Sequence, residues 1–307
     1  MAPRPNDSKK TTTPARETTA SGAGIDRRGF VRVAGLGAAG LAGAVTARGG
    51  SAGTADPRAA AVLADPDWPS LLYYPQDRLA RIALPLGGIG TGTVSLGGRG
   101  DLGDWEIMNR PAKGFVPTGG GAQPFFALFA RKAGAAPVCR ILEGPLQDFE
   151  FEGSHGSPAP NAGLPRFREC SFSSAYPFGR VMLGDAEVPL EVELKAFNPL
   201  VPADTETSAI PVAVLTYELH NPTSGPIEAA VCGNLPNFVG MDGFETRRDW
   251  KGDTLPIGTS KNRNAFRDGV ACRGLFFDSE GVEPRHAARG TMALVTPAQE
   301  GVSHRTS

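Results

Sequence analysis

The chain has 307 residues, enough for one large domain or two small ones. Its 31 Lys and Arg nearly balance its 32 Asp and Glu, and the resulting net charge of −1 excludes a nucleic-acid binder that works through a basic face. The 40 Gly and 27 Pro disfavour an all-helical protein, because both residues interrupt helices. Short strands joined by many turns are expected instead.

The first 47 residues differ in charge from the rest of the chain. They carry seven Lys and Arg against three Asp and Glu, a net charge of +4, which leaves −5 for the remainder. The paired Arg27 and Arg28 precede Phe30, and a weakly apolar run follows at Val33–Val45. That run is shorter than the roughly 20 residues that span a bilayer, but it suits the apolar core of a signal peptide. The arrangement resembles a twin-arginine export signal.

We therefore predict that residues 1–47 are a twin-arginine signal peptide that begins with a disordered leader. The alternative is a disordered basic tail that contains an Ala- and Gly-rich helix. Residues 48–67, rich in Ala, Gly and Asp, are expected to be a linker, and residues 68–307 the folded domain. The expected location of the mature protein is extracellular or periplasmic, without a stable membrane span.

Alternation of apolar and charged residues gives the clearest strand signal, at Val188–Phe197, where a helix would spread the acidic residues around its axis. A second such segment, Pro211–Asn221, leads into the turn Asn221–Pro226, in which Pro fixes φ, Gly permits a positive φ and Asn caps the backbone. We expect residues 179–233 to form antiparallel strands with hairpin-type connections. Further strands are expected at Pro124–Lys132, Gly269–Phe277 and Thr291–Val295.

No sustained helical period is present, and residues 144–166 have the composition of a loop. The sequence therefore predicts an all-β protein, an antiparallel β-sandwich.

The stretch Gly87–Gly100 raises the hypothesis of a phosphate-binding loop. It lacks the lysine and hydroxyl of a G-x-x-x-x-G-K-[ST] motif and the third glycine of the dinucleotide fingerprint. No helical pattern follows that could offer its N-terminus to a phosphate. The stretch is better explained as a tight, bulged turn in which backbone approaches backbone.

Motifs for a nucleophile, a metal or a cofactor are not found in the sequence. It has no G-x-S-x-G, its four histidines are isolated, and its four cysteines do not have zinc-site spacing. Two disulfides remain open for an exported chain, although we expect Cys232 to be a small apolar residue within a strand. The alternating pairs Glu150 and Glu152, and Glu191 and Glu193, are expected on solvated surfaces.

One constellation of polar and aromatic residues stands out within residues 99–111. Its members could contact a sugar or a neighbouring domain, because an indole stacks on sugar faces and the acids, amide and guanidinium bond hydroxyls. A local salt-bridged turn is the alternative. The candidate substrate or domain-interface residues are Asp104, Trp105, Glu106, Asn109 and Arg110.

Several spaced motifs in this sequence occur in the same order in one known family. They are Ile82–Gly92, Arg99–Gly100, Asp104–Pro111, Tyr176–Pro177, Ala196–Pro202, Asp204, Ser208, Pro211–Val214 and Leu219–Thr223. From about Leu72 to its end, the chain resembles the N-terminal domain of glycoside hydrolase family 116. That family includes non-lysosomal glucosylceramidases and bacterial β-glucosidases.

The resemblance implies an N-terminal β-sandwich that is followed by an α-helical toroid of six hairpins. It also implies a retaining β-glucosidase, in which one carboxylate attacks the anomeric carbon and another protonates the leaving oxygen. Both carboxylates belong to the helical domain in this family, so no catalytic residue is carried over to this chain. We expect a truncated chain without that domain, which partners a catalytic α-toroid acting on a β-glucoside, with no cofactor and no metal.

Two hypotheses follow for the function. In the first, the sandwich supports the catalytic domain of an exported β-glucosidase and is inactive alone. In the second, it is a free-standing secreted module that binds carbohydrate or protein. The supporting role predicts an exposed apolar or glycine-rich face around Gly87–Pro111, and self-association of the isolated chain.

Overall fold

The computed structural model describes residues 72–107, 111–117, 123–151, 159–241, 246–248, 254–256 and 261–306. The predicted signal peptide, including Arg27, Arg28 and Phe30, and the predicted linker lie outside these ranges. Within them, no helix has the length and apolar character that a membrane crossing requires.

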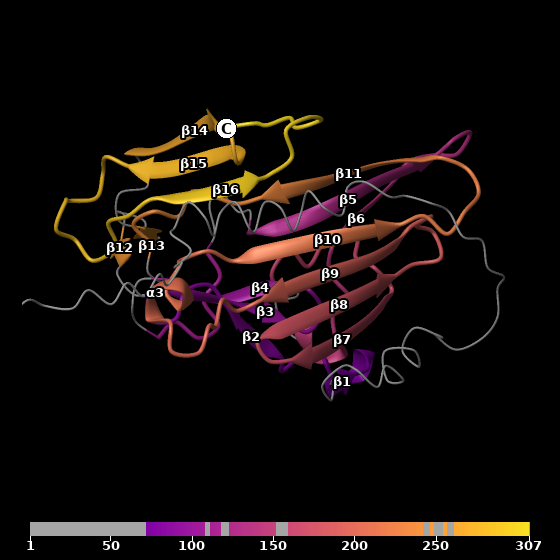
Figure 1. The fold of residues 1–307 in the computed structure, drawn as a ribbon, viewed down its shortest axis with the longest axis horizontal. Coiled ribbons are helices and arrows are strands. Elements are labelled where there is room, and N and C mark those ends of the chain that lie inside the picture. Colours follow the sequence, from indigo (N-terminus) through magenta and orange to yellow (C-terminus); the bar gives the residue numbers. More distant parts are fainter. Residues whose placement is uncertain are drawn as a thin grey trace, which may run out of the picture.

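The largest sheet is antiparallel and forms one layer of the molecule (Figure 1). Its strands run in the order β1-β7-β8-β9-β10. Their bounds are Leu72–Tyr74 for β1, Glu169–Ala175 for β7, Phe178–Gly184 for β8, Glu191–Phe197 for β9 and Val214–His220 for β10. The period-two pattern of β9 is confirmed, because Val192, Leu194 and Ala196 are buried while Lys195 on the opposite face is exposed.

Two three-stranded sheets pack against the inner face of this large sheet. The first contains β2 (Ala83–Leu86), β3 (Thr93–Gly97) and β4 (Leu102–Glu106), and the second has the order β11-β5-β6. The latter strands are Ile227–Asn234, Phe125–Lys132 and Val138–Ile141. A continuous core joins the layers, with side chains such as Leu86, Leu96, Leu128, Phe172 and Leu194 almost fully buried. The predicted all-β sandwich is confirmed.

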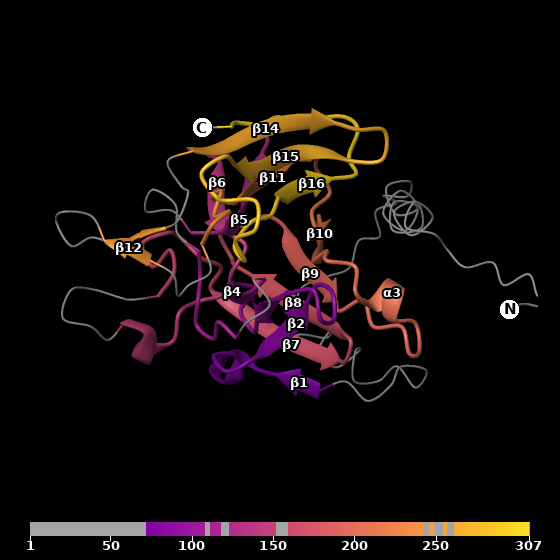
Figure 2. The ribbon, with the colours of Figure 1, turned by 90° about the vertical axis from the view of Figure 1, so that its left-hand side faces the viewer.

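A third three-stranded sheet, β14-β15-β16, lies on the β11 side of the molecule (Figures 1 and 2). Its strands are Asn262–Asp268, Arg273–Ser279 and Met292–Thr296, and a short pair consists of β12 (Thr246–Arg248) and β13 (Thr254–Pro256). The described helices are short: η1 (Gln76–Arg78), η2 (Asp148–Phe151) and α3 (Thr205–Ser208). Asp204 begins α3, where its side chain accepts a hydrogen bond from the Thr207 amide at 3.0 Å.

One predicted connection is wrong. β11 does not pair with β10 as a hairpin; it pairs with β5, in the other layer. The turn itself is as expected, since Asn221 Oδ1 accepts a hydrogen bond from the Thr223 amide at 2.9 Å and Asn221 Nδ2 donates to the Gly225 carbonyl at 2.8 Å. Leu219 and Ile227, on either side of the turn, both pack on the shared core. The turn therefore carries the chain across the core edge from one sheet to the other.

The prediction of one bulged turn for the glycine-rich stretch is only partly correct, because strand β3 occupies its middle and a turn lies on either side. The pairing of β3 with β4 shifts register between Thr93 and Ser95. Gly92 has a φ of 106°, and a Cβ added there would lie 2.8 Å from the Ile107 Cα. Only glycine allows this backbone conformation together with so close an approach.

All four cysteines are free. Cys232 lies in β11, as predicted, but it is exposed and does not fill the core. Its neighbour across the ladder is Ala127 of β5.

Candidate functional site

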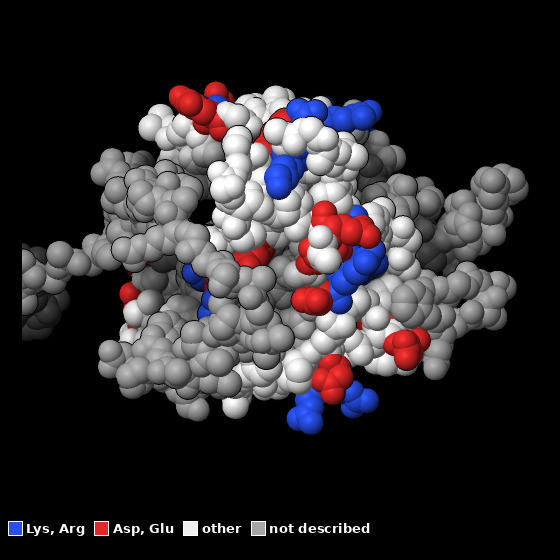
Figure 3. All heavy atoms as spheres, turned by 90° about the vertical axis from the view of Figure 1, so that its right-hand side faces the viewer, with Lys and Arg blue, Asp and Glu red and all other residues white. Residues whose placement is uncertain are grey.

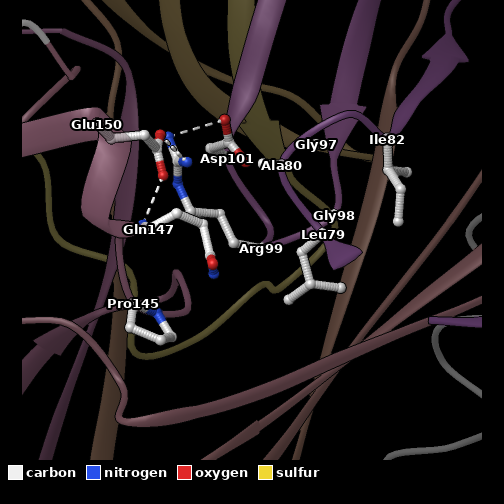
Figure 4. Close-up of a pocket in the computed structure, with 10 residues that line it drawn as sticks. All are labelled: Leu79, Ala80, Ile82, Gly97, Gly98, Arg99, Asp101, Pro145, Gln147 and Glu150. Atoms are coloured by element: carbon white, nitrogen blue, oxygen red, sulfur yellow. Dashed lines mark hydrogen bonds and ion pairs between the residues drawn. The ribbon is translucent and has the colours of Figure 1, made fainter. Parts of the chain in front are cut away.

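A cluster of charged side chains lies at the turn between β3 and β4, centred on Arg99. The Arg99 side chain is only 10% exposed, and its guanidinium group lies 3.2 Å from Asp101 and 3.8 Å from Glu143. It also contacts Glu150, which η2 supplies from 51 positions further along the chain. Figure 4 shows the Asp101 and Glu150 carboxylates on either side of this guanidinium. We call Arg99, Asp101, Glu143, Glu150 and Arg166 the Arg99 cluster.

Arg166 extends the cluster toward β7. Its guanidinium lies 3.3 Å from Glu143 and donates hydrogen bonds to main-chain carbonyls of the loop before it, including Pro160 at 2.7 Å. A main-chain hydrogen bond joins the same two segments, since the Gly144 amide donates to the Arg99 carbonyl at 2.8 Å. The cluster therefore links the β3–β4 turn, the end of β6, η2 and the segment before β7.

A small pocket opens beside Arg99 (Figure 4). Its volume of about 30 Å³ holds about two water molecules, whereas sites for small ligands have roughly 300–1,000 Å³. Arg99, Asp101 and Glu150 line it together with apolar and glycine residues. The pocket is too small for a sugar ring.

Burial shifts the acid–base properties of this region. It raises the pKa of Glu143 to about 7, with a further increase from the charge of Asp101, and these effects outweigh the opposing charges of Arg166 and Arg99. Burial also raises the pKa of the Cys170 thiol, which faces the cluster, to about 12. Cys170 is therefore a neutral and unreactive thiol at ordinary pH.

The sequence-predicted candidates Asp104 and Glu106 lie next to this cluster on β4, where both bind one loop. Asp104 accepts a hydrogen bond from the Gly114 amide at 2.6 Å, and Glu106 accepts one from the Ala112 amide at 2.9 Å. Lys113 lies between the two carboxylates, 3.5 Å from Asp104 and 3.1 Å from Glu106. The two acids thus hold residues 111–115 against the strand, in the manner of a local salt-bridged turn.

Trp105 points the other way and packs on the core. Its ring meets Phe238 edge to face, with centroids 5.1 Å apart, and its Nε1–H donates to the Leu102 carbonyl at 3.4 Å. Asn109 and Arg110 lie outside the described residues. Contact of these five residues with a sugar or a second domain therefore stays a prediction.

Sequence reasoning missed the Arg99 cluster, although it considered one of its members, Glu150. Glu150 was expected on a solvated surface, but its side chain is 15% exposed and contacts Arg99. Glu193 likewise contacts Arg180 and is 14% exposed. Among the described residues, no group of three or more His, Cys, Asp or Glu side chains could hold a metal ion.

An exposed apolar surface covers the end of the sandwich near α3. Four segments meet there: the Asn198 amide donates to the Pro177 carbonyl at 2.9 Å, Asn198 Nδ2 to the Gly87 carbonyl at 3.2 Å, and the Ile89 amide to the Ser208 carbonyl at 2.8 Å. The apolar side chains that these segments leave exposed, here called the apolar end surface, are Ile89, Tyr176, Phe178, Leu200, Val201 and Val212.

The opposite end of the molecule differs in character. Figure 3 shows acidic and basic side chains beside one another there. No single-sign patch dominates this view, in keeping with the near-neutral charge of the whole chain.

The fold and these surfaces define an all-β sandwich domain with exposed apolar side chains at one end. The sequence model described as beta-glucosidase 2, glycosyl-hydrolase family 116 N-term, matches residues 83–307. The chain belongs to this family, as its N-terminal domain. No curated protein matches the chain.

Proposed function

We propose that this chain is the N-terminal β-sandwich domain of an exported, β-glucosidase- or glucosylceramidase-like enzyme, which supports a separate catalytic domain and does not hydrolyse glycosides alone. The family match over residues 83–307 carries the proposal, because an N-terminal domain of this family implies a catalytic partner domain. The description of the family as that of a beta-glucosidase supports a β-glucoside as the substrate class.

The chemistry of the Arg99 cluster supports inactivity of this domain alone. A retaining glycosidase needs two carboxyl groups about 5–5.5 Å apart on either side of the scissile bond, with room for a sugar between them. Asp101 and Glu150 flank a guanidinium group instead, and the pocket beside them has about 30 Å³. The cluster is suited to holding loops together and not to cleaving a glycoside.

The apolar end surface supports a role as a docking partner. Its members are 37–56% exposed, and grouped exposed apolar side chains of this kind are typical of surfaces that bind another protein. Ile89 belongs to the glycine-rich turn around which the sequence predicted such a face. A catalytic domain that packs on this end would remove these side chains from water, a favourable contribution of roughly 25 cal/mol per Å² before the entropic costs of association are subtracted.

Assay of the purified chain tests the proposal directly. We expect no hydrolysis of 4-nitrophenyl β-glucoside above the buffer rate, and activity only when a family 116 catalytic domain is added. Ile89→Asp with Val201→Asp should weaken co-purification with that domain, whereas Val270→Asp, at a fully exposed valine elsewhere, should not. Turnover by the chain alone would refute the scaffold role. Binding of a β-glucan without the added domain would favour a free-standing carbohydrate-binding module.

Export is tested separately in living cells. Arg27→Lys combined with Arg28→Lys should abolish export, because the twin-arginine pathway reads this pair. Sequencing the N-terminus of the exported protein should place its start after residue 47. Mature protein that retains residues 1–47 would contradict the signal-peptide assignment.

A further inference from the structure

Glu143 is the most deeply buried carboxyl group of the Arg99 cluster, with a side chain that is 5% exposed. Within the described part of the chain its Oε2 atom receives no hydrogen bond, although two guanidinium groups approach it. A buried carboxylate is stable only when hydrogen bonds as well as charges replace its lost hydration. Two guanidinium groups lie close to this oxygen, but neither forms a hydrogen bond of good geometry with it.

The two neighbouring guanidinium groups are shared with other partners. Arg99 lies 3.8 Å from Glu143 but 3.2 Å from Asp101, and it also donates a hydrogen bond to Glu150. Arg166 approaches Glu143 to 3.3 Å while it donates to the Pro160 carbonyl at 2.7 Å. Each positive charge is therefore divided among several acceptors, and Glu143 has the longest contact with Arg99.

Other titratable groups that face this region add no positive charge. Cys170 approaches the cluster from β7, and burial keeps its thiol protonated by raising its pKa to about 12. Tyr217 approaches from β10, and burial together with the charge of Glu143 raises the pKa of its phenol well above the ordinary value. Asp101, by contrast, adds a negative charge that opposes ionisation of Glu143.

We propose that Glu143 holds a proton in the folded domain that the unfolded chain has already lost, so that mild acid stabilises the packed Arg99 cluster and alkaline pH weakens it. The inference concerns this domain alone and stands apart from the proposed catalytic partner. The folded domain would then be more stable in mild acid than at alkaline pH because of this one carboxyl group.

The sign of the pH dependence follows from the two states. The ordinary pKa of 4.5 applies to the unfolded chain, and burial raises the pKa of Glu143 to about 7 in the folded domain. The folded state therefore binds this proton more tightly. Its contribution to stability is complete below pH 4.5 and is lost as the pH rises through about 7. An ordinary salt-bridged carboxylate would show the opposite dependence.

Urea unfolding of the full chain and of Glu143→Gln at pH 5.5 and pH 8 tests this proposal. Glutamine is a neutral mimic of the protonated carboxyl group, so the variant should match the parent at pH 5.5. At pH 8 the parent should unfold with an equilibrium constant at least about tenfold larger than that of the variant. The comparison of the two proteins cancels other groups that titrate in this range. Glu228→Gln, at an exposed carboxylate paired with Arg131, should leave the parent's pH dependence unchanged.

A carbon-13 titration of the glutamate carboxyl signals gives a second readout that does not require unfolding. The signal absent from Glu143→Gln should titrate close to neutral pH. Titration of that signal below pH 4.5 would overturn the proposal. So would a Gln variant that is destabilised equally at both pH values or that fails to fold, since either result would mean that the native group is a required anion.

Discussion

Two ionic arrangements arise from the same stretch of chain, and they differ in burial. In the Arg99 cluster the cationic side chain is 10% exposed, whereas Lys113, between Asp104 and Glu106, is 70% exposed. Removing one partner of a buried ion pair lowers the stability of a protein by about 3–5 kcal/mol. An exposed pair contributes only about 0–1 kcal/mol. Charged residues that look alike in the sequence thus differ in importance according to the layers that cover them.

The largest expected effect comes from Arg99→Met. Methionine fills similar space but leaves Asp101, Glu143 and Glu150 without their shared cation, so we expect a loss of about 3–5 kcal/mol of stability. Thermal unfolding should show a midpoint lower by roughly 10 °C. Arg131→Met, which breaks an exposed pair with Glu228, is the matched control and should change the midpoint little. Equal shifts for both variants would remove the distinction.

A smaller effect is expected from Asp104→Ala. Asp104 has a φ of 47°, which alanine adopts with strain, and it accepts the hydrogen bond from the Gly114 amide. We expect a loss of about 1–2 kcal/mol in urea unfolding. Asp104→Asn, which tolerates this φ and retains an acceptor, should lose less. A variant as stable as the parent would show that the loop does not depend on this contact.

The same carboxylate has a pH dependence opposite to that of Glu143. Although partial burial opposes ionisation, the Gly114 amide, Ser95 and Lys113 together lower the pKa of Asp104 below its ordinary 3.8. Its stabilising contribution is therefore present above pH 3.8 and is lost as the pH falls through the lower folded value. The stability difference between the parent and Asp104→Asn should shrink in acid. A difference that grows in acid would contradict this assignment.

The smallest effect is expected from Lys113→Met. The ammonium group is mostly in water, so its removal should change the free energy of unfolding by less than about 1 kcal/mol. Salt screens such exposed charges, and the difference should diminish further when the ionic strength is raised to about 1 M. A salt-independent loss as large as that for Arg99→Met would show that both arrangements are equally buried.

Much of the fold could be predicted because strand patterns are local. The period of two at Val188–Phe197 and the apolar run at Pro124–Lys132 correspond to β9 and β5 within a few residues. The destination of β11 could not be predicted in this way. The sequence of Ile227–Asn234 is compatible with a place in either sheet. Its partner, β5, is decided by how the neighbouring segments pack on the shared core.

The Arg99 cluster could not be found from the sequence for a related reason. Its members come from four segments between positions 99 and 166, and no spacing rule joins them. Glu150 looked like an ordinary surface acid because only the folded topology brings η2 to Arg99. Asp104 and Glu106, in contrast, bind a loop within ten positions, and their local role could be inferred as one of two alternatives.

Asn198 has a consequence for how quickly and tightly another protein could associate with this domain. Its side chain is 2% exposed and donates to the carbonyls of Pro85 and Gly87, which joins the glycine turn to the exit of β9. The backbone beneath the apolar end surface is thus held in place before a second protein binds. Association would require little ordering on this side, and the entropy saved is available as affinity.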